Sequence, residues 1–539
     1  MRTKTQRLFT LCAAACGLAS AALPARAEDW PMWGRTPQRN MVSPEKNAPT
    51  EWDVSSGVNI KWTAQLGSQS YGNVTVANGL AFAGSNNEGM YDKAYNKDAG
   101  VLLGFDEKTG KFLWQNLSPK LAAGRVNDWP FQGICSSPLL ENNLLWYTTS
   151  RCETIAFDMS PLQAGDKPKQ VWKSDMMGQL GVFPHNMTSC SPLSYGDYIY
   201  VITGNGVDEG HKNVPAPTAP AIVCFDKHNG KVVWAKNPPG DNILHGQWSS
   251  PALAEVNGRT QLIAPLGDGW VYAFDAKTGD IIWKFDSNNK NTIYPTTRNE
   301  LISTPVVVGD RMYIANGQDP EHGEGIGHLW CIDITKEGDI SKEIDAGEDV
   351  AANEKAGGEL LRPAGGAKKG KPNPNTGVVW DYEKFDINND GKIRGNERMN
   401  RTISTVCVYN GLVFAPDFSG FFHCLDAKTG KHLWTYDMQS AMWGSPLAVD
   451  GKIYLGDENG DLAIFEAKAD VKEPIAKIDM GSSVYASPIF ANGVLYVMAK
   501  DRLYAIQTGA NSPGNANVNA GEGAGATGNG NGGGADANK

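Results

Sequence analysis

The strongest constraint on the fold of this 539-residue chain is a short phrase that it repeats with variations. In each copy an apolar run ends in Asp, a Thr-Gly or Asn-Gly turn follows, and a second apolar run ends in Trp. Such copies predict two short strands joined by a tight turn, because the apolar runs are brief and stop at turn-forming residues. The clear copies end at Trp114, Trp234, Trp283 and Trp434, and looser ones end at Trp172 and Trp380.

A second recurring element supplies the other half of each unit. A Ser-Pro or Thr-Pro pair opens an apolar strand, a turn such as Asn410-Gly411 follows, and another short strand comes next. Turns of this type favour two-residue hairpins. One unit is therefore four antiparallel strands with the Trp on the fourth. The pairs begin at Ser137, Ser191, Ser250, Thr304, Ser445 and Ser487.

The two ends of the repeat array are complementary. The strand around Trp62 has no first three strands before it, and the last unit, Tyr485 to Gln507, has no fourth strand. We expect the N-terminal strand to complete the C-terminal unit and close a ring. The predicted fold is all-β, an eight-bladed β-propeller of four-stranded antiparallel blades, because closure removes sheet edges that would otherwise be exposed.

The repeated phrase resembles the PQQ-type propeller repeat of quinoprotein alcohol dehydrogenases and of the outer-membrane assembly lipoprotein BamB. The opening EDWPMWGRTPQRNMVS and the stretch RTISTVCVYNGLVFAPDFSGFFHCLDAKTGKHLW also resemble exported PQQ-like propeller proteins typical of Planctomycetes. The resemblance covers residues 28 to about 507 and is specific for the fold. It is weakly specific for function, because the Trp phrase mainly packs neighbouring blades together.

Residues 1–27 predict a cleaved signal peptide. Three basic residues precede an apolar run over residues 8–23, and the segment ends in the small-x-small sequence Ala25-Arg26-Ala27. A lipoprotein alternative would be processed before Cys16. The apolar run is shorter than the ~20 residues of a membrane span, and no other stretch qualifies. We expect an exported protein of the periplasm or cell envelope without a transmembrane span.

The remaining boundaries follow from composition. A lead-in segment covers residues 28–58, the propeller covers 59–507, and a charged Gly/Ala/Lys-rich insertion covers 336–375. The Gly/Asn/Ala-rich tail, residues 508–539, is predicted to be disordered because it has almost no apolar side chains. The formal net charge of −10, with no basic patch beyond one loop cluster, argues against nucleic-acid binding.

Two of the cysteines are placed to form a disulfide. Cys135 starts the first strand of the second blade, and Cys152 lies at the turn between that blade's second and third strands. Both positions project to the same face, and an exported protein meets an oxidising compartment. Cys190 is a competing partner, and buried free thiols are the alternative.

The segment from Asp386 to Glu397 matches the twelve-residue EF-hand loop. Oxygen-bearing side chains fall at positions 1, 3 and 5, Gly391 stands at the sharp turn, and Ile393 is expected to pack inward. This spacing wraps oxygen ligands around a hard cation and predicts a structural Ca²⁺ site. Arg394 at position 9 departs from the pattern, and a metal-free surface turn is the alternative. The expected ligands are Asp386, Asn388, Asp390, Lys392 through its carbonyl, and Glu397.

The starts of the first strands of the blades are expected to line a central funnel. Aligning the residue three positions before each Pro gives the ring Tyr71, Cys135, Ser189, Trp248, Ile302, Ile403, Trp443 and Tyr485. Such a ring could stack a planar ligand. Alternatively, the aromatic side chains plug the axis and Glu300 pairs with Arg401. The candidate cofactor-binding residues are Trp248, Trp443, Tyr485, Gln247, Glu300 and Arg401.

Two functions of different class remain. One is a non-catalytic exported propeller, expected to be a monomer, that binds an envelope protein or peptide. The other, implied by the resemblance, is a PQQ-dependent alcohol or sugar dehydrogenase with a non-standard cofactor site. The chain has neither the adjacent Cys-Cys pair of those dehydrogenases nor a C-x-x-C-H haem motif. We therefore favour the binding protein.

Overall fold

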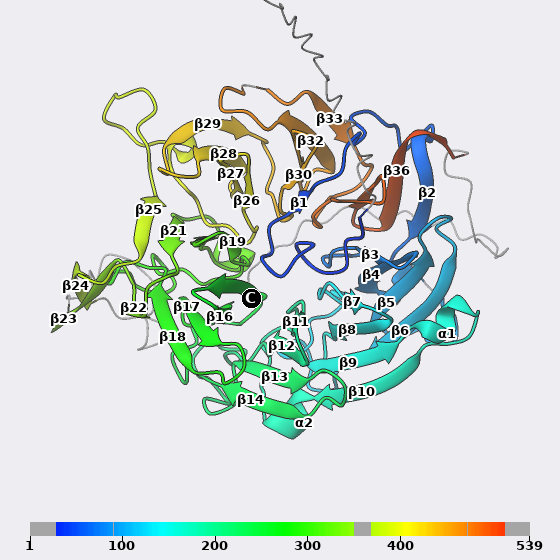
Figure 1. Ribbon diagram of the computed structural model, residues 1–539, viewed down its shortest axis with the longest axis horizontal. Helices are drawn as coiled ribbons and strands as arrows, with labels where there is room; N and C mark the ends of the chain where they lie inside the picture. Colours follow the sequence, from blue (N-terminus) through cyan, green and yellow to red (C-terminus); the bar gives the residue numbers. More distant parts are fainter. Residues whose placement is uncertain (1–27, 90, 350–367, 472, 513–539) are drawn as a thin grey trace, which may run out of the picture.

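The computed structural model describes residues 28–89, 91–349, 368–471 and 473–512 (Figure 1). Within these residues the strands form eight four-stranded antiparallel blades around a central axis, so the predicted β-propeller is confirmed. Helical structure in the described part is confined to short segments, and none of these helices has the length and apolar character needed to cross a bilayer. They are α1 (Ser160–Gln163), α2 (Met176–Leu180), η1 (Asn87–Gly89), η2 (Pro320–His322) and η4 (Gly395–Glu397).

The first four blades follow the chain in order, each from its innermost to its outermost strand. Blade one comprises β3 (Thr75–Ala77), β4 (Leu80–Asn86), β5 (Ala99–Asp106) and β6 (Phe112–Pro119). Blade two comprises β7 (Leu139–Glu141), β8 (Leu144–Thr148), β9 (Glu153–Asp158) and β10 (Lys169–Asp175). Blade three comprises β11 (Leu193–Tyr195), β12 (Tyr198–Ile202), β13 (Ile222–Asp226) and β14 (Val232–Lys236). Blade four comprises β15 (Ala252–Val256), β16 (Arg259–Pro265), β17 (Trp270–Asp275) and β18 (Ile281–Asp286), with β22 (Gly338–Asp339) added outside.

The other four blades complete the ring. Blade five comprises β19 (Val306–Val308), β20 (Arg311–Ala315), β21 (Leu329–Asp333) and β25 (Val378–Tyr382). Blade six comprises β26 (Cys407–Tyr409), β27 (Leu412–Pro416), β28 (Phe421–Asp426) and β29 (His432–Asp437). Blade seven comprises β30 (Leu447–Val449), β31 (Lys452–Gly456), β32 (Asp461–Glu466) and β33 (Ala476–Asp479). Blade eight comprises β34 (Ile489–Ala491), β35 (Val494–Met498), β36 (Arg502–Asn511) and β2 (Val58–Gln65).

Blade eight closes the ring as predicted, because its outermost strand comes from the N-terminal part of the chain. β2 pairs antiparallel with β36, and Trp62 stands opposite Ala505. β36 continues to Asn511, so the propeller extends four residues beyond its predicted end at Gln507. The rest of the predicted tail, from residue 513, and the predicted signal peptide lie outside the described residues.

The repeated phrase docks several of the blades onto the next one. Trp172 donates its indole N–H to the Lys227 carbonyl of blade three at 2.9 Å, and its ring lies over Gly230 in the Asn-Gly turn of that blade. Gly230 has φ +71°, and a Cβ there would lie 2.6 Å from the Trp172 ring. The turn therefore needs glycine both for its left-handed backbone and for the close approach of the indole. The same pairing joins Trp62 with Gly110, Trp234 with Gly279, and Trp380 with Gly430.

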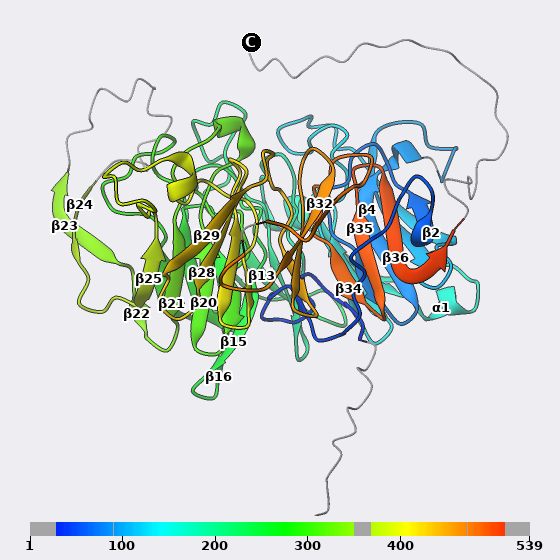
Figure 2. The same cartoon turned by 90° about the horizontal axis from the view of Figure 1, so that it is seen from above.

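The lead-in segment crosses the innermost strands on one face of the ring, where Figure 2 shows it as the dark blue loops at the lower side. β1 (Val42–Ser43) pairs parallel with β30. The backbone of the segment also bonds to blades one, two, four and five, through Trp30 to Val76, Pro31 to Leu140, Pro37 to Leu253, and Gln38 to Val307. A segment predicted only as an approach to the propeller therefore covers one end of its axis.

Arg39 anchors this cover. Its side chain is fully buried, and its guanidinium donates to the carbonyls of Trp33, Ser191, Pro192 and Pro251 at 2.7–3.1 Å. Burial lowers the pKa of Arg39 to about 10, so the group is still charged at neutral pH. Four carbonyl acceptors compensate for the removal of this charge from water.

Part of the insertion predicted over residues 336–375 forms a β-hairpin. β23 (Glu343–Asp349) pairs antiparallel with β24 (Lys368–Pro372), and this hairpin projects from the side of the ring between β22 and β25 (Figure 1). Residues 350–367 lie outside the described part of the chain.

The docking of Trp172 on Gly230 predicts a specific stability difference between two glycine substitutions. Gly258→Ala is the matched control, because Gly258 has φ +76° but no neighbouring atom within 4 Å of a Cβ. We expect this control to cost about 1–2 kcal/mol from backbone strain. Gly230→Ala should cost a further ~1–3 kcal/mol, because Trp172 must move. Urea unfolding midpoints measure both, and equal losses would contradict the docking role of the indole.

Candidate functional site

The eight predicted ring residues all line one axial cavity, so their predicted positions are confirmed. The cavity has a volume of about 190 Å³, and Gln132, Asn186, Met187, Asp319 and Pro320 extend its wall toward one face. On the opposite side of the ring the axial space is bordered by Trp33 of the lead-in, whose indole donates to Thr304 Oγ1 at 3.1 Å. We call the end lined by Asn186 and Asp319 the funnel mouth.

One wall of the cavity is an aromatic cluster. The ring centroid of Tyr485 lies 5.0 Å from that of Tyr71 and 5.1 Å from that of Trp443. Glu458 accepts hydrogen bonds from the Trp443 indole at 3.4 Å and the Tyr485 hydroxyl at 3.3 Å. Burial raises the pKa of Tyr71 above its ordinary value. This wall therefore presents neutral aromatic surface with a carboxylate behind it.

Trp248 lies on another part of the wall and is tied to the connections above it. Its indole N–H donates to the His185 carbonyl at 3.0 Å. Gln247 is buried and does not line the cavity, because its amide bonds to the Asn205 carbonyl at 2.8 Å and to the Gly267 N–H at 3.2 Å. Of these two candidates, Trp248 alone has its side chain on the cavity.

Glu300 and Arg401 are also buried away from the cavity, and they form no ion pair with each other within the described residues. The Arg401 guanidinium instead donates to Asn299 Oδ1 at 3.1 Å and to several loop carbonyls, including that of Pro295 at 2.9 Å. Glu300 accepts from the Tyr294 hydroxyl at 3.1 Å, and its Oε1 faces His245 Nδ1 at 3.6 Å. The carboxylate is thus turned toward a group of histidines.

Four of the chain's eight histidines meet at the rim of the funnel mouth. They come from the connections that precede β11, link β12 to β13, precede β15, and link β20 to β21. The ring centroid of His245 lies 4.4 Å from that of His185, 4.5 Å from that of His211 and 5.0 Å from that of His322. Glu321 Oε1 lies 3.2 Å from His245 Nε2 and 3.6 Å from His211 Nε2. We call these four histidines with Glu300 and Glu321 the histidine cluster.

Burial and mutual charge set the proton affinities in the histidine cluster. Burial and the neighbouring His245 lower the pKa of His185 to about 4. Burial opposes protonation of His245 as well, but Glu300 and Glu321 raise its pKa to about 10. The contact with His245 lowers the pKa of Glu321 to about 2. His245 is therefore the positively charged centre of the cluster between two carboxylates.

The histidine cluster was not identified in the sequence analysis. His211 and His322 lie in long connections outside the repeated strands, so the repeat alignment gives them no position. The available signal was weak: connections from three successive blades each carry a histidine. Such connections gather on one face of a propeller.

The predicted Cys135–Cys152 disulfide is wrong. Every cysteine in the described residues is a free thiol. Cys135 lines the axial cavity, whereas Cys152 is buried within the blade and donates to the Thr203 carbonyl at 3.4 Å. The competing partner Cys190 accepts from the Ile202 N–H at 3.2 Å. Both buried thiols have backbone partners, so the alternative of free core cysteines describes them.

The EF-hand-like loop lies on the outside of blade six, between β25 and β26. Asp386 accepts from the Asp390 and Gly391 N–H groups, and the buried Glu397 accepts from the Ile387 N–H at 3.2 Å and the Arg394 N–H at 2.8 Å. The Arg394 guanidinium bridges Asp390 and Glu397. Ile393 is 39% exposed, so the expectation that it packs inward is wrong. The loop has a compact backbone, with an arginine between two of the predicted ligands.

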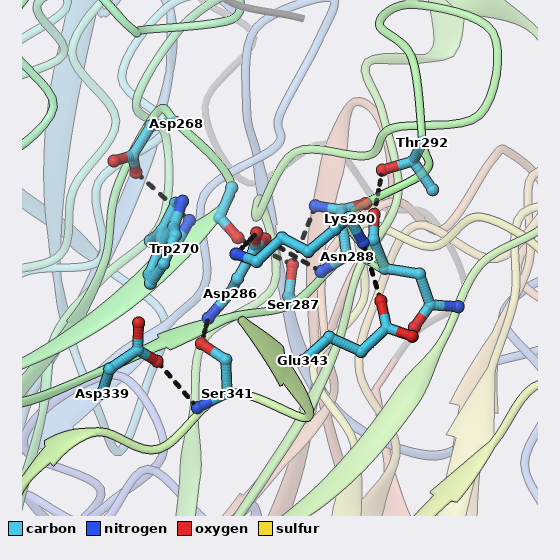
Figure 3. Close-up of polar contacts among 12 residues, drawn as sticks. Asp268, Trp270, Asp286, Ser287, Asn288, Lys290, Thr292, Asp339, Ser341 and Glu343 are labelled. Atoms are coloured by element: carbon cyan, nitrogen blue, oxygen red, sulfur yellow. Dashed lines mark hydrogen bonds and ion pairs between the residues drawn. The ribbon is translucent and has the colours of Figure 1, made fainter. Parts of the chain in front are cut away.

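A larger lateral cavity, about 360 Å³, lies beside the β23–β24 hairpin. Figure 3 shows its polar contacts, with Asp286 and Lys290 beside Trp270. Asp286 receives the Lys290 ammonium at 2.7 Å and the Arg298 guanidinium at 3.0 Å, and the Lys290 nitrogen lies 4.3 Å from the Trp270 ring centroid. The charges here compensate one another, so we place the candidate site at the funnel mouth.

A protein-family model described as "Outer membrane protein assembly factor BamB" matches residues 166–347 and 384–472, just over half of the chain. These residues include most of blades three to seven. The match therefore rests on the repeats themselves rather than on the lead-in or the first two blades.

Two curated relatives carry the same description. The protein from Moranella endobia (strain PCIT) is 26% identical over 265 residues, 46% of this chain and 60% of its own length. The protein from Shewanella oneidensis is 33% identical over 264 residues, 47% of this chain and 58% of its own length. The chain thus spans about three fifths of the length of these relatives.

Among solved structures, a europium-containing methanol dehydrogenase is similar with a TM-score of 0.57 and 13% identity. The alignment covers 89% of this chain and 98% of that one. At this identity the likeness concerns the fold alone.

Proposed function

Because the chain belongs to the family described as outer membrane protein assembly factor BamB, we propose that it is an exported propeller that binds another protein of the cell envelope and catalyses no reaction in doing so. Export rests on the predicted signal peptide. The binding role rests on the family and on the shape of the axial cavity.

The observation that carries the proposal is the asymmetry of the axis. The lead-in and its buried Arg39 cover one end, whereas the funnel mouth leads to an aromatic wall. Aromatic side chains in a recess are typical anchors of protein interfaces. The mouth is acidic, with Asp319 on its wall and Glu458 behind Trp443. The partner that fits is an extended protein segment carrying a basic side chain next to an aromatic or aliphatic one.

This proposal predicts that partner binding depends on the mouth. Trp443→Ala should weaken binding by about 30-fold or more, as expected for an interface anchor. Asp319→Asn should mainly reduce the association rate and its salt dependence. Trp270→Ala in the lateral cavity is the matched control and should bind like the wild type. The measurement is capture from an envelope extract, followed by kinetics with the purified partner. A partner lost with Trp270→Ala but kept by Trp443→Ala would contradict the proposal.

The second candidate is the PQQ-dependent dehydrogenase that the resemblance of the repeats implies. The residues here fit the cofactor poorly. Glu300 and its neighbour Asn299, whose side-chain oxygens are of the kind that Ca²⁺ binds, are buried behind the wall. Asn299 is already engaged with Asn316, Ile326 and Arg401.

A spectroscopic titration separates the two candidates. We expect PQQ with Ca²⁺ to leave the absorption spectrum of the protein and cofactor additive, and we expect no dye reduction with alcohols or sugars. Stoichiometric PQQ binding with turnover that Trp248→Ala abolishes would favour the dehydrogenase instead. Trp270→Ala again serves as the control.

We further propose that the Asp386–Glu397 loop binds a structural Ca²⁺ when Arg394 swings outward. Asp386, Asn388 and Asp390 already hydrogen-bond within one turn, and Glu397 is held by two backbone N–H groups. The Arg394 guanidinium contributes a competing positive charge between Asp390 and Glu397. Removing it should strengthen cation binding.

Calcium titrations of two variants test this loop. Arg394→Gln should tighten Ca²⁺ binding several-fold, because the competing charge is gone, and Glu397→Gln should abolish it. Lys431→Gln, at the exposed Thr-Gly turn of blade six, removes the same charge outside the loop and is the control. Calorimetry and the Ca²⁺-dependent shift of the thermal midpoint measure the effect. Equal Ca²⁺ affinity in Arg394→Gln and in the wild type would contradict the proposal that the Arg394 guanidinium competes with the cation.

A further inference from the structure

The histidine cluster has no part in the proposed binding role. Its members lie at the rim above Trp248, because the His185 carbonyl holds the Trp248 indole at 3.0 Å. We propose that His185, His211, His245 and Glu321 bind one divalent transition-metal ion of the zinc class at the funnel mouth.

The ligand atoms are already close to one another. One nitrogen from each of His185, His211 and His245 lies within 4.8 Å of the other two. Glu321 Oε1 lies 3.2 Å from His245 Nε2 and 3.6 Å from His211 Nε2. Bond lengths of 2.0–2.2 Å in a tetrahedral zinc site place ligand atoms roughly 3.4 Å apart. The three imidazoles therefore need only small side-chain rotations to surround one ion, and Glu321 lies beside two of them as the fourth ligand.

Neighbouring groups orient two of the imidazoles for this role. His185 Nδ1 lies 2.8 Å from the Val207 carbonyl, so Nδ1 carries the proton and the lone pair is left on Nε2. His245 Nδ1 faces Glu300 Oε1 at 3.6 Å, and the Tyr294 hydroxyl fixes that carboxylate. Metal-bound histidines characteristically donate their second nitrogen to a carbonyl or a carboxylate. Both arrangements occur here, and His245 Nε2 faces Glu321 within the cluster.

The cluster also contains buried polar atoms that lack hydrogen bonds. His245 is fully buried, and neither of its ring nitrogens has hydrogen-bond geometry with another group in the part of the chain that the structure describes. Glu300 Oε2 is also buried without a hydrogen-bond partner among the described residues. Leaving a buried polar atom unsatisfied costs about 1–3 kcal/mol, so such atoms need an explanation. A metal ion on His245 Nε2 displaces the proton that this nitrogen carries toward Glu321, and it leaves the Nδ1–H facing Glu300.

The donor set selects the class of metal. Three imidazoles and one carboxylate suit Zn²⁺ and neighbouring first-row ions. Ca²⁺ and Mg²⁺ prefer six or more oxygen ligands, which the cluster lacks. His322 lies within reach as well, because one of its nitrogens groups with His211 and Glu321 within the same 4.8 Å limit. His322 can therefore serve as a fifth ligand. Other divalent ions of the first transition-metal row accept five ligands more readily than zinc does.

The test uses the full mature chain, stripped of metal by a chelator and titrated with Zn²⁺ against a chromophoric competitor. We expect one high-affinity ion per chain. Co²⁺ should replace it and give visible d–d bands of a four- or five-coordinate nitrogen-ligated site. His211→Gln and Glu321→Gln are the informative variants because both side chains are partly exposed and are not needed to fill the core. Each should weaken Zn²⁺ binding by at least about tenfold.

Two controls separate this site from others. His228→Gln removes an exposed histidine that pairs with Asp197 outside the cluster, and it should bind Zn²⁺ like the wild type. Glu397→Gln removes the predicted calcium ligand and should also leave Zn²⁺ binding unchanged. Thermal midpoints of the metal-free variants confirm that each is folded. The proposal is overturned by fewer than one ion per chain, by wild-type affinity in both His211→Gln and Glu321→Gln, or by a Co²⁺ spectrum of a six-coordinate aquo-like ion. Because the readout is metal content, it is independent of partner binding.

Discussion

The pairing of β2 with β36 is the interaction on which the rest of the structure depends. It joins residues 58–65 to residues 502–511 and turns a row of seven complete blades into a ring. The entropic cost of so long a closure is modest, because the closure entropy grows only with the logarithm of loop length, about 0.6 kcal/mol per doubling. In return, Trp62 docks on Gly110 of blade one, as Trp172, Trp234 and Trp380 dock on glycines of their own next blades. The ring of residues that lines the axis exists only when this circle is closed.

The second constraint is the lead-in, which makes the two ends of the axis different. The repeats alone leave both ends of the axis uncovered. Here the backbone of the lead-in bonds to the innermost strands of five blades, and Arg39 is surrounded by four carbonyls. These bonds also connect blades that are far apart in sequence, so the cover and the ring stabilise each other. The funnel mouth is consequently the end at which the connections between blades are accessible from the axis.

The fold could be predicted from the sequence because its decisive contacts recur. A Trp in one blade and a Gly in the next form the same pair at several positions, and the Pro-based alignment fixed which residues face the axis. The path of the lead-in could not be predicted, since it is held mainly by backbone hydrogen bonds that leave no side-chain pattern. The Cys135–Cys152 pairing failed because alternation along strands does not fix the radial position: Cys135 faces the axis, whereas Cys152 lies inside the blade. The histidine cluster was missed because its members come from connections of different length.

The two proposals for the funnel mouth are physically linked. Without a metal ion, Glu321 and Asp319 give the rim a negative potential, which favours a basic partner segment. A bound divalent ion adds two positive charges within the same rim, close to the side chain of Trp248. The ion therefore weakens the attraction for a basic side chain while offering a ligand position to a carboxylate or histidine. Because coupling between two binding equilibria is reciprocal, a partner that prefers one state of the rim must change the metal affinity by the same factor. The two proposed equilibria at the funnel mouth are therefore linked through charge.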